Sequence, residues 1–312
     1  MSILIVPTDY PTIQDAVDAA VTGDTVRVLN GEYTESVVVS TPGIKLRAME
    51  DVTMTGAAVG GTAFTVRTDD VIIRGFRIVG YDLGIGLYGN TNRVTGCLPV
   101  FNNTYGIKIN GDENTVRNSS IGGNQIAGIS LTGNSNLIEN CTIDSNELAG
   151  ISMLSGESKE NVIRTNNIAG TIVGITLLSK GATYNLIKSN VIRFSRFGIA
   201  LFGPCNTVKS NLLMEIDRVG VLVNQTGNYV VSNSVIDSLL GVSVLQDCNI
   251  ISSNSMTNSE TYGLSLMGKG NMANCNVLVK NLVGILSLDE NTIKENQYLL
   301  NDKDVIVTTS PY

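Results

Sequence analysis

The sequence contains no histidine and no tryptophan, and only 16% of its 312 residues are charged. The lack of histidine excludes a zinc centre of the usual mixed Cys/His kind. Proline is scarce, at 6 residues, whereas there are 32 glycines and many asparagines. Glycine and asparagine tolerate left-handed backbone, so this composition favours strands joined by tight turns. The net charge of −7 argues against a nucleic-acid partner.

Targeting signals are also missing from the sequence. No segment approaches the length and apolarity of a membrane span, and the N-terminal run Met-Ser-Ile-Leu-Ile-Val-Pro lacks the basic start and the length of a secretory signal. We therefore expect no membrane insertion and, by default, a cytoplasmic protein, with association to a surface or coat as the alternative. A homo-oligomer is compatible with the sequence but is not indicated by it.

A glycine followed by alternating aliphatic residues recurs about every 22 residues. The repeated glycines are Gly84, Gly106, Gly128, Gly150, Gly174, Gly198, Gly220, Gly241, Gly263 and Gly284. In parallel, asparagines from Asn92 to Asn291 are each followed two residues later by a small or branched apolar residue and then by an outward residue. Such a period indicates a solenoid, and the alternation indicates strands. The sequence thus predicts an all-β, single-stranded, right-handed parallel β-helix with coils of about 22 residues.

A third column contains asparagine in seven consecutive coils. Its members are Asn166, Asn190, Asn211, Asn233, Asn254, Asn276 and Asn296. Amides stacked at the strand spacing can bond to one another, so we predict an asparagine ladder inside a turn. Cys97 and Cys141 share this column two coils apart, roughly 9.6 Å at the strand spacing, which is too far for a disulfide. We expect all five cysteines to stay reduced and none to bind a metal.

The two ends of the chain depart from the repeat. Thr12 and Asp15 form a capping box before an apolar face of Ala16, Val17 and Ala20, which predicts a short capping helix. We expect one β-helix domain over residues 1–312, with an N-terminal cap at 1–23 and irregular coils at 24–83. Regular coils are expected at 84–296 and a C-terminal cap at 297–312.

Residues 11–20, 23–28 and 31–39, with their Thr-Ile-Gln and Gly-Glu-Tyr-Thr-Glu motifs, resemble the N-terminal cap of pectin methylesterases. The later coils resemble the NosD-like, or PbH1, repeats of the pectin-lyase-like superfamily. The resemblance covers nearly the whole chain and implies the fold without specifying chemistry. The esterase motifs are missing apart from Gln246 and Asp247, and related epimerases use a histidine. Pectate lyases would need aspartates for Ca²⁺ and an arginine base, which this chain can supply.

The first candidate site is an outward column of charged residues, Arg117, Glu139, Arg164, Lys188 and Lys209. Such a row could follow an acidic polysaccharide along the coils. The alternative is a solvated sheet face on which Glu139 pairs with the neighbouring arginines.

The second candidate is the stretch that contains Arg193, Arg196, Glu215, Asp217 and Arg218. Arg196 and Arg218 each lie two residues before a repeat glycine, where other coils carry aliphatic residues, and a local break of the pattern is a place for function. A lyase could use one arginine as a base while Glu215 and Asp217 hold Ca²⁺. The alternative is a structural ladder of ion pairs.

The third candidate is a pair of two-residue insertions in adjacent coils, at residues 155–160 and 179–184. Insertions of this kind often form a binding rim, and Tyr184 could stack on a sugar ring. Taken together, the sequence favours a non-catalytic β-helix with a structural, coat or carbohydrate-binding role and no cofactor. The alternative is a pectate-lyase-like polysaccharide lyase or hydrolase, for which alone Ca²⁺ would be expected.

Overall fold

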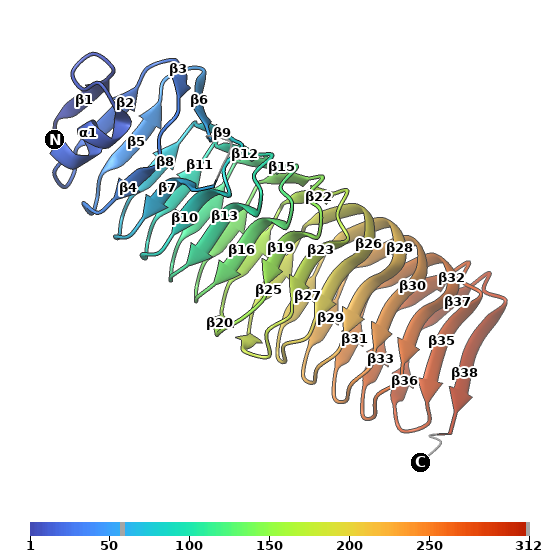
Figure 1. The fold of residues 1–312 in the computed structure, drawn as a ribbon. Coiled ribbons are helices and arrows are strands. Elements are labelled where there is room, and N and C mark those ends of the chain that lie inside the picture. Colours follow the sequence, from blue (N-terminus) through green and yellow to red (C-terminus); the bar gives the residue numbers. More distant parts are fainter. Residues whose placement is uncertain (57–59, 310–312) are drawn as a thin grey trace. The chain divides into compact units, whose positions relative to one another are not determined.

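The computed structural model describes residues 1–56 and 60–309, and the chain folds into stacked parallel β-coils of about 22 residues each (Figure 1). The predicted right-handed parallel β-helix is confirmed. The chain divides into two compact units, Met1–Ile151 and Ser152–Tyr312. In each unit one wall of the coil is formed by short strands of one sheet, which we call A strands. The remaining walls are formed by strands of a second sheet, which we call B strands.

The A strands are short and pair in parallel within each unit. In the first unit they are β1 (Ile3–Val6), β2 (Thr25–Val28), β5 (Lys45–Ala48), β8 (Ile72–Arg74), β11 (Arg93–Thr95), β14 (Thr115–Arg117) and β17 (Leu137–Glu139). In the second they are β21 (Val162–Arg164), β25 (Leu186–Lys188), β27 (Thr207–Lys209), β29 (Tyr229–Val231), β31 (Ile250–Ser252), β33 (Met272–Asn274) and β36 (Thr292–Lys294).

The B strands lengthen in the middle of the second unit. The earlier ones are β3 (Gly31–Tyr33), β4 (Val37–Val39), β6 (Val52–Thr55), β7 (Thr62–Val66), β9 (Arg77–Val79), β10 (Leu83–Leu87), β12 (Leu98–Val100), β13 (Tyr105–Asn110), β15 (Ser120–Gly122), β16 (Ala127–Thr132), β18 (Thr142–Asp144) and β19 (Ala149–Met153). The later ones are β22 (Asn167–Ala169), β23 (Val173–Leu177), β26 (Val191–Leu201), β28 (Leu212–Val223), β30 (Ser234–Val244), β32 (Ser255–Leu266), β34 (Val277–Val279), β35 (Val283–Leu288), β37 (Gln297–Leu299) and β38 (Lys303–Thr308).

In the three-residue A strands the middle residue faces the interior, while its two neighbours face outward. Val94 and Val116 are in register and fully buried in the first unit, as are Ile187 and Val208 in the second. Burial of branched aliphatic side chains therefore holds each coil on the next, at about 25 cal/mol per Å² of apolar surface. Because the inward column is fixed, the outward columns on both sides of it are fixed as well.

The predicted capping helix is α1 (Ile13–Ala19), at the N-terminal end of the first unit (Figure 1). Thr12 is its N-cap, and its hydroxyl accepts a hydrogen bond from the Asp15 backbone N–H at 3.0 Å. The Glu35 carboxylate accepts hydrogen bonds from the Ile13 and Gln14 N–H groups, each at 3.0 Å. Ile13 is fully buried, so α1 covers apolar surface of the first coil and its exposed backbone donors are satisfied.

The predicted asparagine ladder is present in the second unit, where Asn211 Nδ2 donates to Asn233 Oδ1 at 2.9 Å. Two further columns behave in the same way. The asparagines that marked the repeat also form buried ladders, for example from Asn161 to Asn185, and a third column joins Asn102 to Asn124. Buried polar groups are stable only when paired, which explains why these positions repeat the same amide.

Residues 297–308, expected to cover the last coil, instead form β37 and β38. These strands pair in register with β34 and β35. Because they extend the parallel pairing of both strands, this segment adds wall to the coil rather than a lid over it.

Candidate functional site

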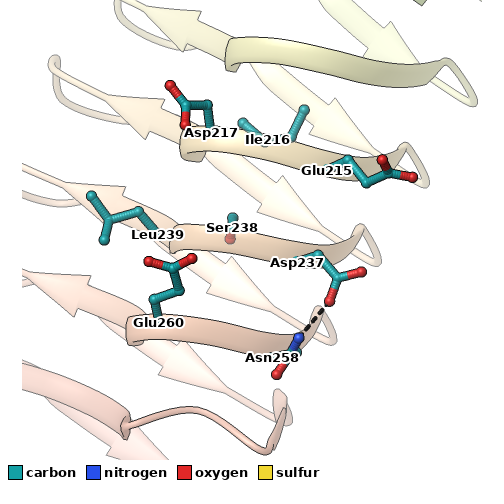
Figure 2. A pocket seen from close by; sticks show the side chains of 8 residues that line it. All are labelled: Glu215, Ile216, Asp217, Asp237, Ser238, Leu239, Asn258 and Glu260. Atoms are coloured by element: carbon teal, nitrogen blue, oxygen red, sulfur yellow. Dashed lines mark hydrogen bonds between the residues drawn. The ribbon is translucent and has the colours of Figure 1, made fainter.

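A groove lies on the outer surface of the second unit, and half of the residues that line it are carboxylates (Figure 2). It has a volume of about 330 Å³ and is formed by β28, β30 and β32. The lining residues are Glu215, Ile216, Asp217, Asp237, Ser238, Leu239, Asn258 and Glu260. Ile216, Ser238 and Ser259 are in register on the three strands. The residues that precede them therefore lie on one rim of the groove, and the residues that follow them lie on the other. The first rim is Glu215, Asp237 and Asn258, and the second is Asp217, Leu239 and Glu260.

The bend that creates the groove comes from left-handed backbone. Glu215, Asp237 and Asn258 have φ angles of 53°, 55° and 57°, and their side chains are exposed along one rim. Asn258 Nδ2 donates a hydrogen bond to Asp237 Oδ1 at 2.6 Å (Figure 2). Four carboxylates and no cationic side chain line the groove. Its field therefore repels anions and favours cations or neutral hydroxyl groups.

The structure brings only part of the second sequence candidate into this groove. Glu215 and Asp217 line it, whereas Arg196 and Arg218 do not. A bulge lies between Ile216 and Val219, so two residues of β28 stand opposite one of β26 and the expected stacking of the two arginines is broken. Within the described residues neither arginine forms an ion pair with a carboxylate, and the Arg196 guanidinium lies 6.0 Å from the Phe197 ring.

The residues of the first sequence candidate, the charged column, lie in a row within each unit. In the second unit Arg164, Lys188 and Lys209 are in register on the outward face of the A strands, which we call the A face. In the first unit Arg117 and Glu139 occupy the same row. Sequence reasoning missed Tyr229, which is 47% exposed on the A face of the second unit and pairs with Thr207.

The two insertions of the third candidate pair with each other. They form a two-stranded parallel sheet of β20 (Ser158–Lys159) and β24 (Ala182–Thr183). Tyr184 follows β24, is 65% exposed and lies two residues before β25. It therefore borders the A face at the turn that leads into β25. Arg193 is exposed on β26, a B strand, and does not join this surface.

The fold and its repeated coils place the protein among the right-handed parallel β-helix proteins of the pectin-lyase-like superfamily. Residues 17–193, more than half of the chain, match the family described as "Periplasmic copper-binding protein (NosD)". The chain belongs to this family. No curated protein sequence matches it.

Solved structures share the fold at low sequence identity. A mannuronic acid specific polysaccharide family 6 lyase from human gut microbiota is 14% identical with a TM-score of 0.70, over 99% of this chain and 91% of that one. A PL6 family alginate lyase is 16% identical with a TM-score of 0.73, and a pectate lyase is 16% identical with a TM-score of 0.57. These matches cover 95% of this chain in both cases, but 53% of the alginate lyase and 79% of the pectate lyase. At such identities they establish the fold alone.

The cysteines and carboxylates of this chain, which lacks histidine, do not fit the copper site that the family description implies. Copper sites are built from imidazole and sulfur ligands, and the chain has no histidine. Burial raises the pKa of the Cys97 and Cys141 thiols to about 11 each, which disfavours the thiolate form that binds metal. Among the described residues no three Cys, Asp or Glu side chains form a group that could hold a metal ion.

The two cysteines in the turn before the A strands are also too far apart to share a metal. Cys205 Sγ lies over Gly227, 3.3 Å from the position that a Cβ would occupy there, and Cys248 Sγ lies over Gly270 in the same manner at 3.6 Å. The thiols are thus separated by two strand spacings, about 9.6 Å. No chemistry of this chain is assigned to copper.

We predict that the purified chain retains well under one copper per molecule. Incubation with Cu(I) or Cu(II), gel filtration and elemental analysis by mass spectrometry would measure the retained metal. A stoichiometric copper content that is lost in a Cys205→Ser/Cys248→Ser variant would contradict the prediction and locate the site. Loss of copper in a Cys97→Ser variant would instead point to the interior.

Proposed function

We propose that the protein is a non-catalytic carbohydrate-binding β-helix whose binding surface is the A face of the second unit. The observation that carries this proposal is that Lys188, Lys209 and Tyr229 lie on the A face, with the exposed Tyr184 at its border. Neither lysine forms an ion pair within the described residues, so both ammonium groups are available to a ligand.

The chemistry of these side chains suits a sugar chain that lies across the strands. A tyrosine ring offers an apolar face for the C–H groups of a sugar and a hydroxyl for its polar edge. Each lysine supplies three donors for hydroxyl or carboxylate oxygens. Because strands repeat at about 4.8 Å, a linear polymer can meet equivalent positions on successive coils. The solved lyases that share the fold act on polysaccharides by their names, which supports a ligand of the same class.

The carboxylate groove favours binding over catalysis. A lyase for acidic polysaccharides needs a base near the substrate and positive charge to stabilise the substrate carboxylate as it reacts. The groove offers four carboxylates, while Arg196 and Arg218 lie outside its lining. An acidic substrate would be repelled there unless a cation such as Ca²⁺ intervened. The lyase therefore remains the alternative function, and its requirement for Ca²⁺ makes it testable.

The family description names a periplasmic protein, which supports a location outside the cytoplasm rather than the cytoplasmic one expected from the N-terminal sequence. No helix in the described residues is long and apolar enough to cross a membrane. We propose that the protein acts at or near a cell surface, where extended polysaccharides are available.

Replacing Tyr184 and Tyr229 together with alanine is expected to weaken polysaccharide binding roughly tenfold or more, because each aromatic contact contributes on the order of 1 kcal/mol. Affinity electrophoresis against a panel of neutral and acidic polysaccharides would measure the change. A Lys188→Ala/Lys209→Ala variant should weaken binding of acidic polymers more than of neutral ones.

Tyr88→Ala and Lys303→Ala serve as controls, since both residues are exposed but lie on or beside B strands. Release of unsaturated products in the presence of Ca²⁺, detected by ultraviolet absorbance, would overturn the non-catalytic proposal in favour of the lyase. Absence of binding to every polymer would leave only a structural or coat role.

A further inference from the structure

The A face of the first unit carries a concentration of arginines that the sequence pattern did not reveal. The register places Arg27, Arg47 and Arg74 side by side on β2, β5 and β8, and Arg117 in the same row on β14. Lys45 and Arg93 occupy the second outward row of the same strands. We call the six cations of these two rows the basic face: Arg27, Lys45, Arg47, Arg74, Arg93 and Arg117.

The basic face has no carboxylate within its five strands. The other outward positions are Thr25, Ile72, Thr95 and Thr115, and the next carboxylate in the row is Glu139 on β17. Within the described residues none of the six cations forms an ion pair or donates a side-chain hydrogen bond to the protein. The nearby turn carboxylate of Asp69 is already engaged, since it accepts a hydrogen bond from the Asn90 N–H at 2.7 Å.

This arrangement is not what a merely solvated face requires. Solvated sheet faces mix charges of both signs, and like charges on directly opposed positions of neighbouring strands are unfavourable. Yet six of the nine Lys and Arg residues of the first unit gather here, in a chain with a net charge of −7. Five of the six are arginines, whose planar fork matches a carboxylate with two parallel hydrogen bonds. A bound anion would satisfy these donors and remove the repulsion.

We infer that the basic face binds a linear polysaccharide that carries one carboxylate per sugar, a uronan, with the chain running across the A strands. The inference rests on the proposed carbohydrate-binding function and adds a second surface and a ligand class to it. Arg27, Arg47 and Arg74 repeat at the strand spacing of about 4.8 Å, so a linear chain that crosses the strands can place carboxylates of its sugars against this row. A polysaccharide can reach the basic face, because the side chains of Arg47, Arg74 and Arg93 are exposed.

The test compares two double variants that remove equal charge from the same unit. Arg47→Gln/Arg74→Gln removes the centre of the basic face. Arg67→Gln/Arg77→Gln removes two exposed arginines of the first unit that lie outside the A strands. Binding of polygalacturonate and polymannuronate oligomers of increasing length would be measured by calorimetry at low and high NaCl, with circular dichroism to confirm folding.

We expect the basic-face variant to bind uronan oligomers roughly tenfold or more weakly, and the control variant to differ from the wild type by less than about twofold. Affinity should rise with oligomer length and fall with NaCl, and carboxyl-reduced oligomers should not compete. Equal losses in both variants, or equally tight binding of single-stranded DNA, would overturn the inference because nonspecific charge would then explain the binding.

Failure of this inference can be told apart from failure of the proposed function. If the wild type binds neutral glycans but no uronan, the basic face has another role and the carbohydrate-binding function stands. If uronan binding survives in Arg47→Gln/Arg74→Gln but is lost in Lys188→Ala/Lys209→Ala, the A face of the second unit is the site and this inference falls. If no carbohydrate binds at all, both fall.

Discussion

Replacing Asn233 with alanine should lower the free energy of unfolding by about 3–5 kcal/mol, because it opens a buried hydrogen-bond ladder in its middle. Asn233 is 2% exposed, and its Oδ1 accepts from the Asn211 backbone N–H and from Asn211 Nδ2, both at 2.9 Å. Its Nδ2 donates to the Val208 carbonyl at 2.9 Å and to Asn254 Oδ1 at 3.0 Å. Alanine leaves the buried Asn211 backbone N–H without this partner and breaks the amide chain between Asn211 and Asn254. Asn211 Nδ2 keeps its bond to the Ile187 carbonyl, and Asn254 Oδ1 keeps its bond from the backbone N–H of residue 233.

Urea unfolding followed by circular dichroism would measure the effect of Asn233→Ala. Asn274→Ala is the matched control, because Asn274 faces outward on β33 and its side chain makes only an exposed contact with Cys275. The control should change the free energy of unfolding by less than about 0.5 kcal/mol. Similar values for the two variants would mean that the ladder contributes no more than any surface amide.

Replacing Gly241 with alanine should destabilise the protein by about 3 kcal/mol through a collision with backbone. A Cβ on Gly241 would lie 2.3 Å from the Gly263 carbonyl oxygen and 2.8 Å from Met256 Cγ. The Gly263 carbonyl belongs to the adjacent strand β32, so it cannot move away without breaking the pairing of β30 with β32. The same approach of neighbouring coils recurs at Gly198 and Gly220, which explains the glycine of the repeat.

Gly270→Ala separates this collision from backbone strain. Gly270 has a left-handed φ of 62°, but a Cβ there meets only Cys248 Sγ at an ordinary distance of 3.6 Å. Gly270→Ala should therefore lower the free energy of unfolding by about 1 kcal/mol, because of the left-handed backbone conformation alone. Thermal and urea unfolding of the two variants should rank Gly241→Ala as clearly less stable, and the reverse order would show that the coils can move apart at Gly241.

The columns of the fold were predictable wherever the spacing of the repeat is nearly constant. The ladder from Asn166 to Asn296 was predicted because identical amides recur at intervals close to one coil. The ladders through Asn161 and Asn102 carried the same signal. The first was interpreted only as a marker of the period, and the second is shorter, so neither was recognised as a ladder.

The candidate sites were less predictable, because they depend on which coil residues face one another. Arg27, Arg47 and Arg74 are separated by 20 and 27 residues, so no constant period links them in the sequence. The bulge between Ile216 and Val219 likewise shifts Arg218 out of the row of Arg196. Asp237 and Glu260 join Glu215 in a groove only because the backbone bends at the same point in three coils.

The sequence alone determined the solenoid, its capping helix and one asparagine ladder, because burial and amide stacking repeat once per coil and leave a periodic trace. Only the tertiary structure decided which charges share a face where the coil length varies. Strand register converts irregular spacings into rows, and it brought the six cations of the basic face together while it left Arg196 and Arg218 outside the carboxylate groove. A row of surface charges leaves a period in the sequence only where the coil length is nearly constant, as from Arg117 to Lys209, whereas the row of Arg27, Arg47 and Arg74 lies on coils of different lengths.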